Sequence, residues 1–276
     1  MIVKLSGFAD EISPDLNIQL DVLHTERINY LELRSVWGKN IVDIDFQEVI
    51  QVKEVLDSKG IQVSSIGSPI GKIGIQDDFQ GHLAKFDKVI ETAKYLGTRF
   101  IRVFSFFIPE DKDPLIYRDE VMRRMNILVR RAEEGGVILL HENEKGIFGS
   151  DAERCLDLLT TCQSPNFRAV FDPANFVQCG VKPFTDAYPL LENYIEYVHV
   201  KDALFSNGTV VPAGEGDGQI EEMYRALKAK GYKGFMSLEP HLAAEGTFFG
   251  FSGSELFKVA TKQLKEILRS IDAEWK

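Results

Sequence analysis

Four side chains that can bind metal ions follow apolar, β-rich runs in the second half of the sequence. They are Glu142, Asp172, His199 and Glu239, and each stands where such a run ends. Three carboxylates and one imidazole make a mainly oxygen ligand set, which suits Mn²⁺, Mg²⁺ or Co²⁺ and also accommodates Zn²⁺. A capping or ion-paired role explains any one of these residues, but four in succession indicate a shared site. The pattern therefore predicts one divalent metal ion.

Two further polar residues have the spacing to face this site. Residues two apart in a strand share a face, so Lys201 is expected beside His199 and His241 beside Glu239. At the ends of parallel strands such side chains would point toward a bound substrate. We therefore predict that Lys201 and His241 contact the substrate.

Charged residues also interrupt two apolar runs in the first half of the chain. Arg102 lies between Ile101 and Val103, so it needs either a buried anionic partner or a polar cavity. A substrate contact and a structural salt bridge inside the fold both stay open for it. Glu32 and Arg34 share a face at the end of another run and could pair with each other.

Three loops after expected strands carry further candidates for substrate binding. Lys72 ends the segment Ser68–Lys72 and could reach the site, although a solvated surface position explains it equally well. Glu215 lies in the glycine-rich loop Gly214–Gly218, whose acids oppose a phosphate and better suit sugar hydroxyls. The segment Gly250–Ser254, in contrast, could present backbone N–H groups to a phosphate. Because these cues conflict, the sequence leaves open whether the substrate is phosphorylated.

Eight β-rich runs recur along the chain, each followed by a stretch with helical periodicity. This alternation predicts right-handed parallel βαβ units, and eight such units close into a (β/α)8 TIM barrel. Barrel enzymes place their chemistry at the C-terminal ends of the strands, where the four predicted ligands stand. The expected strands are Val3–Phe8, Tyr30–Leu33, Gln62–Ile66, Phe100–Phe104, Val137–His141, Ala169–Phe171, Tyr197–Val200 and Phe235–Leu238.

Helix-start signals support this α/β alternation. Ser13-Pro14-Asp15 offers an N-cap, a proline at the first helical position and an acid in the first turn. Asp45, Asp151 and Ser254 are expected to cap later helices, and the helix around 183–189 is the weakest. A doubly wound open sheet would need a glycine-rich phosphate turn after the first strand, which this sequence lacks. With no break in composition, we predict a single domain over residues 1–276.

Composition and charge narrow the class of protein. The 276 residues carry a formal net charge of -10, which repels nucleic acid and anionic lipid. Three cysteines without zinc-ribbon spacing argue against a disulfide framework. Neither a signal peptide nor an apolar run of about 18 residues is visible. We therefore expect a soluble, cytoplasmic protein that binds neither nucleic acid nor membranes.

Five short motifs, in order along the chain, resemble those of the xylose isomerase-like barrel superfamily. This superfamily gathers sugar and sugar phosphate isomerases and epimerases, inosose dehydratase-like proteins and type IV AP endonucleases. The resemblance covers essentially the whole chain and implies that Glu142, Asp172, His199 and Glu239 bind one metal. It also allows a homo-oligomer. The motifs are His141–Glu144, Phe171–Asn175, His199–Asp202, Gly214–Gly216 and Leu238–His241.

The resemblance further implies an isomerase or epimerase of a small sugar, ketose or sugar phosphate. The metal would polarise the ketone and its neighbouring hydroxyl, which lowers the cost of forming an enediolate. Glu142 and Glu239 come from strands three apart, so one can remove a proton and the other return it. These two are the predicted catalytic residues. The predicted substrate contacts are Lys72, Arg102, Asn175, Lys201, Glu215 and His241.

One position departs from the epimerase pattern and leaves alternatives open. Asn175 stands where those enzymes have a substrate-binding histidine, and asparagine can hydrogen-bond a hydroxyl but cannot titrate near neutral pH. A dehydratase of a keto-inositol would use the same metal and the same enolisation. A non-catalytic sugar-binding barrel would have lost a ligand or an acid/base residue, and none is missing. An AP endonuclease binds three zinc ions through extra histidines, whereas this acidic chain has five histidines in all.

Overall fold

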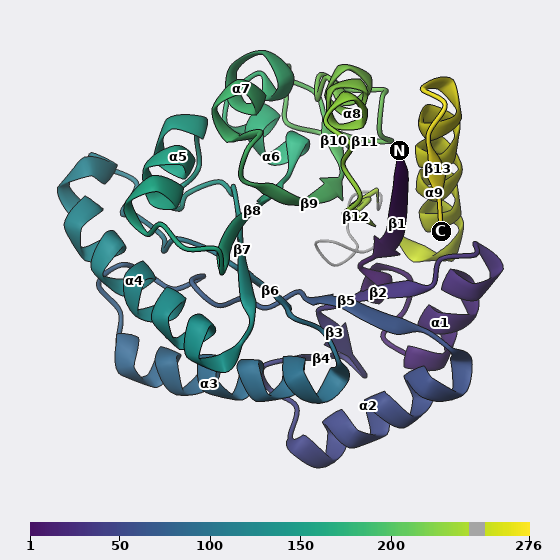
Figure 1. Ribbon diagram of the computed structural model, residues 1–276, viewed down its shortest axis with the longest axis horizontal. Coiled ribbons are helices and arrows are strands. Elements are labelled where there is room, and N and C mark those ends of the chain that lie inside the picture. The colour runs from purple at the N-terminus through teal and green to yellow at the C-terminus, as the bar shows by residue number, and fades with distance from the viewer. Residues whose placement is uncertain (243–251) are drawn as a thin grey trace.

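The computed structural model describes residues 1–242 and 252–276 and contains a parallel β-barrel surrounded by helices (Figure 1). The TIM barrel prediction is confirmed, and each predicted strand is present to within two residues at either end. Residues 250 and 251 of the expected phosphate-binding segment Gly250–Ser254 lie outside the described residues. The barrel strands are β1 (Ile2–Gly7), β2 (Tyr30–Leu33), β5 (Gln62–Ile66), β6 (Phe100–Val103), β7 (Ile138–Glu142), β8 (Phe167–Phe171), β9 (Ile195–Val200) and β12 (Phe235–Leu238).

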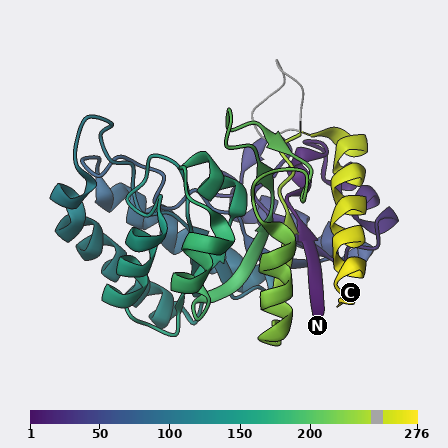
Figure 2. The ribbon, with the colours of Figure 1, turned by 90° about the horizontal axis from the view of Figure 1, so that it is seen from above.

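A short additional strand, β13 (Glu274–Trp275), joins this sheet beside β1. The strand order is β13-β1-β12-β9-β8-β7-β6-β5-β2, and β1 contacts β2 to close the ring. β13 runs parallel to β1, with Ile2 opposite Glu274 and Val3 opposite Trp275. The two chain termini therefore lie together at one end of the barrel (Figure 2). A strand of two residues is too short for its periodicity to be recognised in a sequence.

Helices follow most of the barrel strands and pack around the sheet (Figure 1). After β8 three short helical segments replace one long helix, which agrees with the weak helical pattern around residues 183–189. The long helices are α1 (Leu16–Thr25), α2 (Phe46–Lys59), α3 (Phe79–Leu96), α4 (Arg118–Gly135), α5 (Ala152–Thr161), α8 (Ile220–Ala229) and α9 (Gly253–Ser270). The short elements are η1 (Ala9–Glu11), η2 (Pro114–Tyr117), α6 (Pro173–Gln178), η3 (Pro183–Ala187) and α7 (Tyr188–Leu191), with the hairpins β3 (Ser35–Val36)–β4 (Lys39–Asn40) and β10 (Asp202–Ala203)–β11 (Val210–Val211).

The helix caps follow the sequence signals in part. Asp45 and Asp151 cap α2 and α5 as predicted, and Asp45 forms a reciprocal capping box with Glu48. At α1 the cap is Asp15, whose side chain accepts two backbone N–H bonds, so the cap predicted at Ser13 lies two residues too early. The cap expected at Ser254 is wrong. α9 begins at Gly253, so Ser254 already lies inside the helix.

Aromatic side chains close the N-terminal end of the barrel interior. The Tyr197 and Phe235 rings stack with centroids 5.4 Å apart, and Phe100 lies 6.3 Å from both. Above them the Tyr197 hydroxyl is 2.9 Å from the Ser64 hydroxyl, which in turn is 2.6 Å from that of Ser6. These side chains are buried and fill the interior at that end of the barrel. Among residues 1–242 and 252–276, none of the helices is long and apolar enough to cross a membrane.

Gly71, in the loop after β5, should not tolerate a side chain. Its φ is +91°, and an added Cβ would lie 2.0 Å from the Phe104 carbonyl oxygen. We expect Gly71→Ala to lower the free energy of unfolding by about 3 kcal/mol or more, measured by urea denaturation. The control is Gly136→Ala, at φ +69° with open space around the added Cβ. It should cost only about 1 kcal/mol, and equal losses would contradict the steric explanation.

Candidate metal centre

The four predicted ligands converge at the C-terminal mouth of the barrel. Glu142 ends β7 and His199 lies in β9, while Asp172 and Glu239 directly follow β8 and β12. All four are buried, and each offers a ligand atom within 4.8 Å of the others. His199 Nδ1 is 3.2 Å from Glu142 Oε1, 3.4 Å from Glu239 Oε2 and 3.7 Å from Asp172 Oδ2. Neighbouring parallel strands produce this meeting because their carboxyl ends share one edge.

The local geometry of Asp172 leaves one of its oxygens directed at this cluster. Asp172 caps α6, and its Oδ1 accepts the Asn175 backbone N–H at 2.9 Å. Oδ2 is buried and faces charged side chains, with the Lys201 ammonium at 2.8 Å and His199 Nδ1 at 3.7 Å. Three buried carboxylates so close together repel one another unless cations lie among them. The donor set therefore fits a divalent ion with a preference for oxygen ligands, and the four residues could hold it.

Lys201 supplies one positive charge to the cluster. Its ammonium nitrogen lies 2.8 Å from Asp172 Oδ2 and 3.0 Å from Glu239 Oε2, and its side chain is buried. Lys201 stands two residues beyond His199, as the strand period predicted. The structure thus places it beside two of the predicted ligands.

Two arginines supply further positive charge from the other side of the mouth. Arg102 Nη1 lies 3.1 Å from Glu142 Oε2 and 3.7 Å from Glu239 Oε1. Arg34 Nη1 lies 3.1 Å from Glu239 Oε1, and its Nε donates to Asp10 Oδ2 at 2.7 Å. Both guanidinium groups lie against the Phe8 ring, at 4.8 Å and 4.6 Å from its centroid. Arg102 is buried and pairs with Glu142, so it has the anionic partner that a charged residue in an apolar strand requires.

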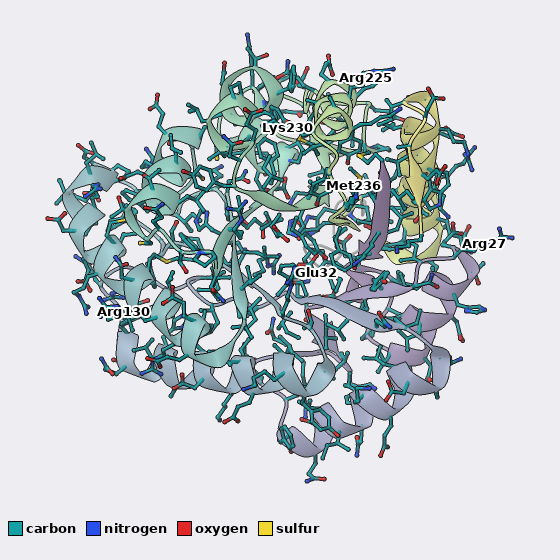
Figure 3. All side chains as sticks on the ribbon, in the orientation of Figure 1. Arg27, Glu32, Arg130, Arg225, Lys230 and Met236 are labelled. Atoms are coloured by element: carbon teal, nitrogen blue, oxygen red, sulfur yellow. The ribbon has the colours of Figure 1, made fainter. Side chains whose placement is uncertain are left out.

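The pairing of Arg34 with Glu32 that the sequence allowed does not occur. Arg34 bonds to Asp10 and Glu239, whereas Glu32 lies inside the ring of strands, as Figure 3 shows. There Glu32 Oε2 is 3.4 Å from Nε2 of His199. The register of β2 against β5 shifts between Leu31 and Glu32, and β2 ends at Leu33. The regular alternation that would place the two side chains together therefore does not continue to Arg34.

Asn175 and His241 both reach the predicted ligands. Asn175 Nδ2 donates to Glu142 Oε1 at 3.0 Å and to the Asn143 carbonyl at 2.9 Å. His241 Nε2 lies 3.8 Å from Glu239 Oε1, and its backbone N–H donates to Glu11 Oε2 at 2.8 Å. Their substrate-binding roles remain predictions, but both stand at the mouth of the barrel.

Lys72 and Glu215 lie farther from the cluster. Lys72 pairs with Glu144 at 2.9 Å and lies over the Phe104 ring, partly exposed. Glu215 is exposed and lies in the glycine-rich loop. The carboxylate of Asp202 holds the backbone of this loop by accepting the N–H groups of three glycines. The structure does not bring Glu215 to the four ligands.

Glu11 is a buried acid of the mouth that the sequence patterns did not single out. It lies in η1, directly after β1, and its Oε2 accepts the Ser252 hydroxyl at 2.7 Å. Burial raises its pKa to about 8 despite the nearby charge of Arg34. Glu11, Glu239 and His241 also offer ligand atoms within 4.8 Å of one another. A weaker signal was present, because Asp10 and Glu11 stand within four residues of the end of the barrel strand β1.

The surrounding cations keep both candidate acid/base residues ionised. Burial alone would raise the pKa of Glu142, but the charges of His199 and Arg102 outweigh it and hold the pKa at about 2. For Glu239 the ammonium of Lys201 overcomes burial in the same way and places the pKa well below its usual value. Both side chains are therefore carboxylates, the form that binds a cation or accepts a proton.

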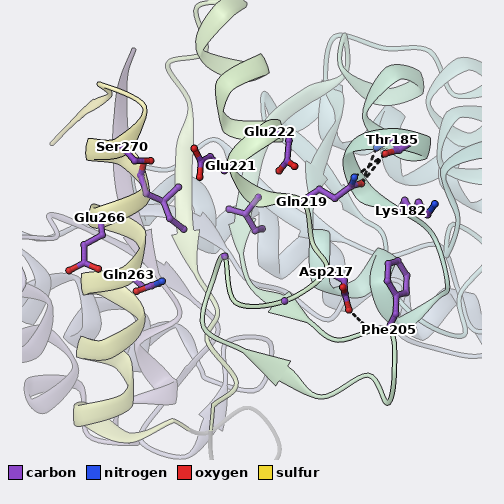
Figure 4. A pocket seen from close by; sticks show the side chains of 14 residues that line it. Lys182, Thr185, Phe205, Asp217, Gln219, Glu221, Glu222, Gln263, Glu266 and Ser270 are labelled. Carbon is purple, nitrogen blue, oxygen red and sulfur yellow. Dashed lines mark hydrogen bonds between the residues drawn. The ribbon is translucent and has the colours of Figure 1, made fainter.

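A separate cleft of about 850 Å³ lies on the outer surface between α8 and α9 (Figure 4). Its lining includes the carboxylates of Asp217, Glu221, Glu222 and Glu266. None of the predicted site residues lines it. The chemistry suggested by the ligand set therefore belongs to the barrel mouth and not to this cleft.

Comparisons with known proteins agree with the barrel fold. The chain is 25% identical over 179 residues to the 2-epi-5-epi-valiolone 7-phosphate 2-epimerase of Actinoplanes sp., and this match covers 64% of each protein. Among solved structures it resembles a D-tagatose 3-epimerase-like protein, with a TM-score of 0.79 and 18% identity over 98% of both chains. It also resembles the IolI protein with a bound zinc atom, with a TM-score of 0.76 and 18% identity over 98% of this chain and 99% of that one.

Identities this low do not assign the chain to a family, but a protein-family model does. The model described as xylose isomerase-like TIM barrel matches residues 28–266, which include all four predicted ligands. Members of this family include sugar isomerases and epimerases. By this match, the chain belongs to the xylose isomerase-like TIM barrel family.

Proposed function

We propose that the protein is a divalent-metal-dependent isomerase or epimerase of a small ketose or sugar phosphate. The observation that carries the proposal is the convergence of Glu142 and Glu239, from strands three apart in the ring, on one buried cluster with Asp172 and His199. The family assignment supports an isomerase or epimerase. The name of the Actinoplanes relative, a 2-epimerase of a 7-phosphate, supports testing phosphorylated substrates.

A divalent ion held by these four residues would polarise the substrate carbonyl and its neighbouring hydroxyl. Glu142 and Glu239 are the acid/base pair in this proposal. One carboxylate takes the proton from the carbon beside the carbonyl, and the other, after taking up a proton from solvent, delivers that proton to the opposite face. The resulting enediolate is negatively charged, so the fixed cations of Lys201 and Arg102 stabilise it.

The other polar residues of the mouth would orient the substrate. Asn175 presents an amide that donates to Glu142 and can hydrogen-bond a sugar hydroxyl, but it cannot shuttle a proton. His241 and Lys72 reach the mouth from the loops after β12 and β5 and are proposed to contact the distal end of the substrate. Glu215 could join them only if its loop moved toward the mouth.

The test is proton exchange with solvent, followed by NMR in D₂O. Protein loaded with Mg²⁺ or Co²⁺ is incubated with a panel of ketoses, ketose phosphates and a keto-inositol. Deuterium appearing beside the carbonyl of one compound, with a new stereoisomer or isomer, is the expected result. Exchange accompanied by loss of water would identify a dehydratase instead. Metal binding with no exchange across the panel would contradict the proposal for these substrate classes.

A further inference from the structure

Glu32 is a buried carboxylate without an ordinary structural role. It lies in β2, is 1% exposed, and neither of its oxygens makes a hydrogen bond among the described residues. Leaving a carboxylate buried without such bonds is costly, and native structures rarely do so without a reason. Nε2 of His199 lies 3.4 Å from Glu32 Oε2. That nitrogen also lacks a hydrogen bond among the described residues, so two unsatisfied atoms face each other.

The His199 ring is held in an orientation that separates its two nitrogens. Nδ1 faces the carboxylates of Glu142 and Glu239, at 3.2 Å and 3.4 Å. Nε2 points the other way, toward Glu32. The Phe8 ring meets the imidazole edge-on at 5.2 Å, and the Tyr197 ring lies perpendicular to it at 6.0 Å. These rings hinder rotation of the imidazole.

We propose that Glu32 is a positioning residue of the metal centre. In the metal-bound protein it would accept the Nε2–H of His199, which now lies 3.4 Å away, and so favour the form in which Nδ1 has lost its proton and its lone pair points at the other three ligands. A histidine that binds a metal usually donates its second N–H to a carboxylate or carbonyl, which fixes the ring and makes it a stronger ligand. Arg34, which the sequence offered as a partner for Glu32, is already engaged by Asp10 and Glu239.

This inference rests on the metal-binding part of the proposed function and not on the reaction. Its readout is the affinity for Mn²⁺ in the absence of substrate, measured by titration calorimetry. Glu32→Gln keeps the shape of the side chain but removes its charge. Glu32→Asp keeps the charge but moves it away from His199. Ser64→Ala is the matched control, because it removes a buried polar group of the barrel interior that bonds to Ser6 and Tyr197.

We expect Glu32→Gln to weaken Mn²⁺ binding by about 10- to 100-fold. Glu32→Asp should fall between that variant and the native protein, and Ser64→Ala should match the native protein. Thermal unfolding of the metal-free forms checks that each variant folds, and the Asp variant keeps the test decisive if the Gln variant does not fold. Binding by Glu32→Gln within about twofold of native, or an equal loss in Ser64→Ala, would overturn the proposal. Tight native binding without proton exchange would count against the reaction alone, whereas no native binding would overturn both.

Discussion

Glu239→Gln should lose turnover by about 10³-fold or more while the protein keeps its fold. The glutamine retains the size of the side chain but can neither accept the substrate proton nor offer a charged ligand oxygen. It also removes one of the two close anionic partners of Arg34 and of Lys201, which both lie within 3.1 Å of the native carboxylate, while Asp10 and Asp172 remain. Turnover is measured on whichever substrate shows exchange in D₂O, and the fold is checked by circular dichroism.

The control for this substitution is Glu196→Gln, a carboxylate of β9 at the opposite end of the barrel. Glu196 pairs with Arg99 and Arg168 at 3.7 Å and 3.9 Å. Its replacement should change turnover by less than about twofold, because exposed ion pairs contribute little to stability and this one lies away from the mouth. Near-normal turnover in Glu239→Gln would rule out the acid/base assignment.

Removing the metal should abolish turnover and lower the melting temperature by about 5 °C relative to protein saturated with Mn²⁺. An ion present at about 100 times its dissociation constant stabilises the folded state by roughly 2.7 kcal/mol. For a chain of this length each kcal/mol corresponds to about 2 °C. Without the ion, three buried carboxylates face one another with only protein cations between them. The measurement is thermal unfolding after chelation, at constant ionic strength, with turnover recovered on adding Mn²⁺ back.

A ligand variant separates specific binding from a general salt effect. In Asp172→Asn the Oδ1 that caps α6 can still accept the Asn175 N–H, but the buried Oδ2 becomes an amide nitrogen. We expect this variant to fold and to lose most of the metal-dependent shift in melting temperature. A native melting temperature that is the same with and without Mn²⁺ would contradict the proposed metal centre.

Several features of the protein follow from its sequence alone. Strand and helix periodicities repeat eight times, and hydrophobic burial converts that repetition into a barrel. Because all the barrel strands are parallel, the residues at their carboxyl ends all lie at the same end of the barrel. For this reason Glu142, Asp172, His199 and Glu239 could be expected to meet, and the strand period of two places Lys201 beside His199.

Other features depend on how the barrel closes. Arg34 and Glu239 are 205 residues apart in the sequence, yet they bond because β1 lies next to both β2 and β12. Periodicity predicts which face of its strand a side chain lies on, but it does not predict which residue of another strand that side chain contacts inside the barrel. That depends on the stagger and tilt of all the strands together. Tertiary structure therefore decided that Glu32 lies against His199, that Glu11 is buried at the mouth, and that Glu215 is held away from it.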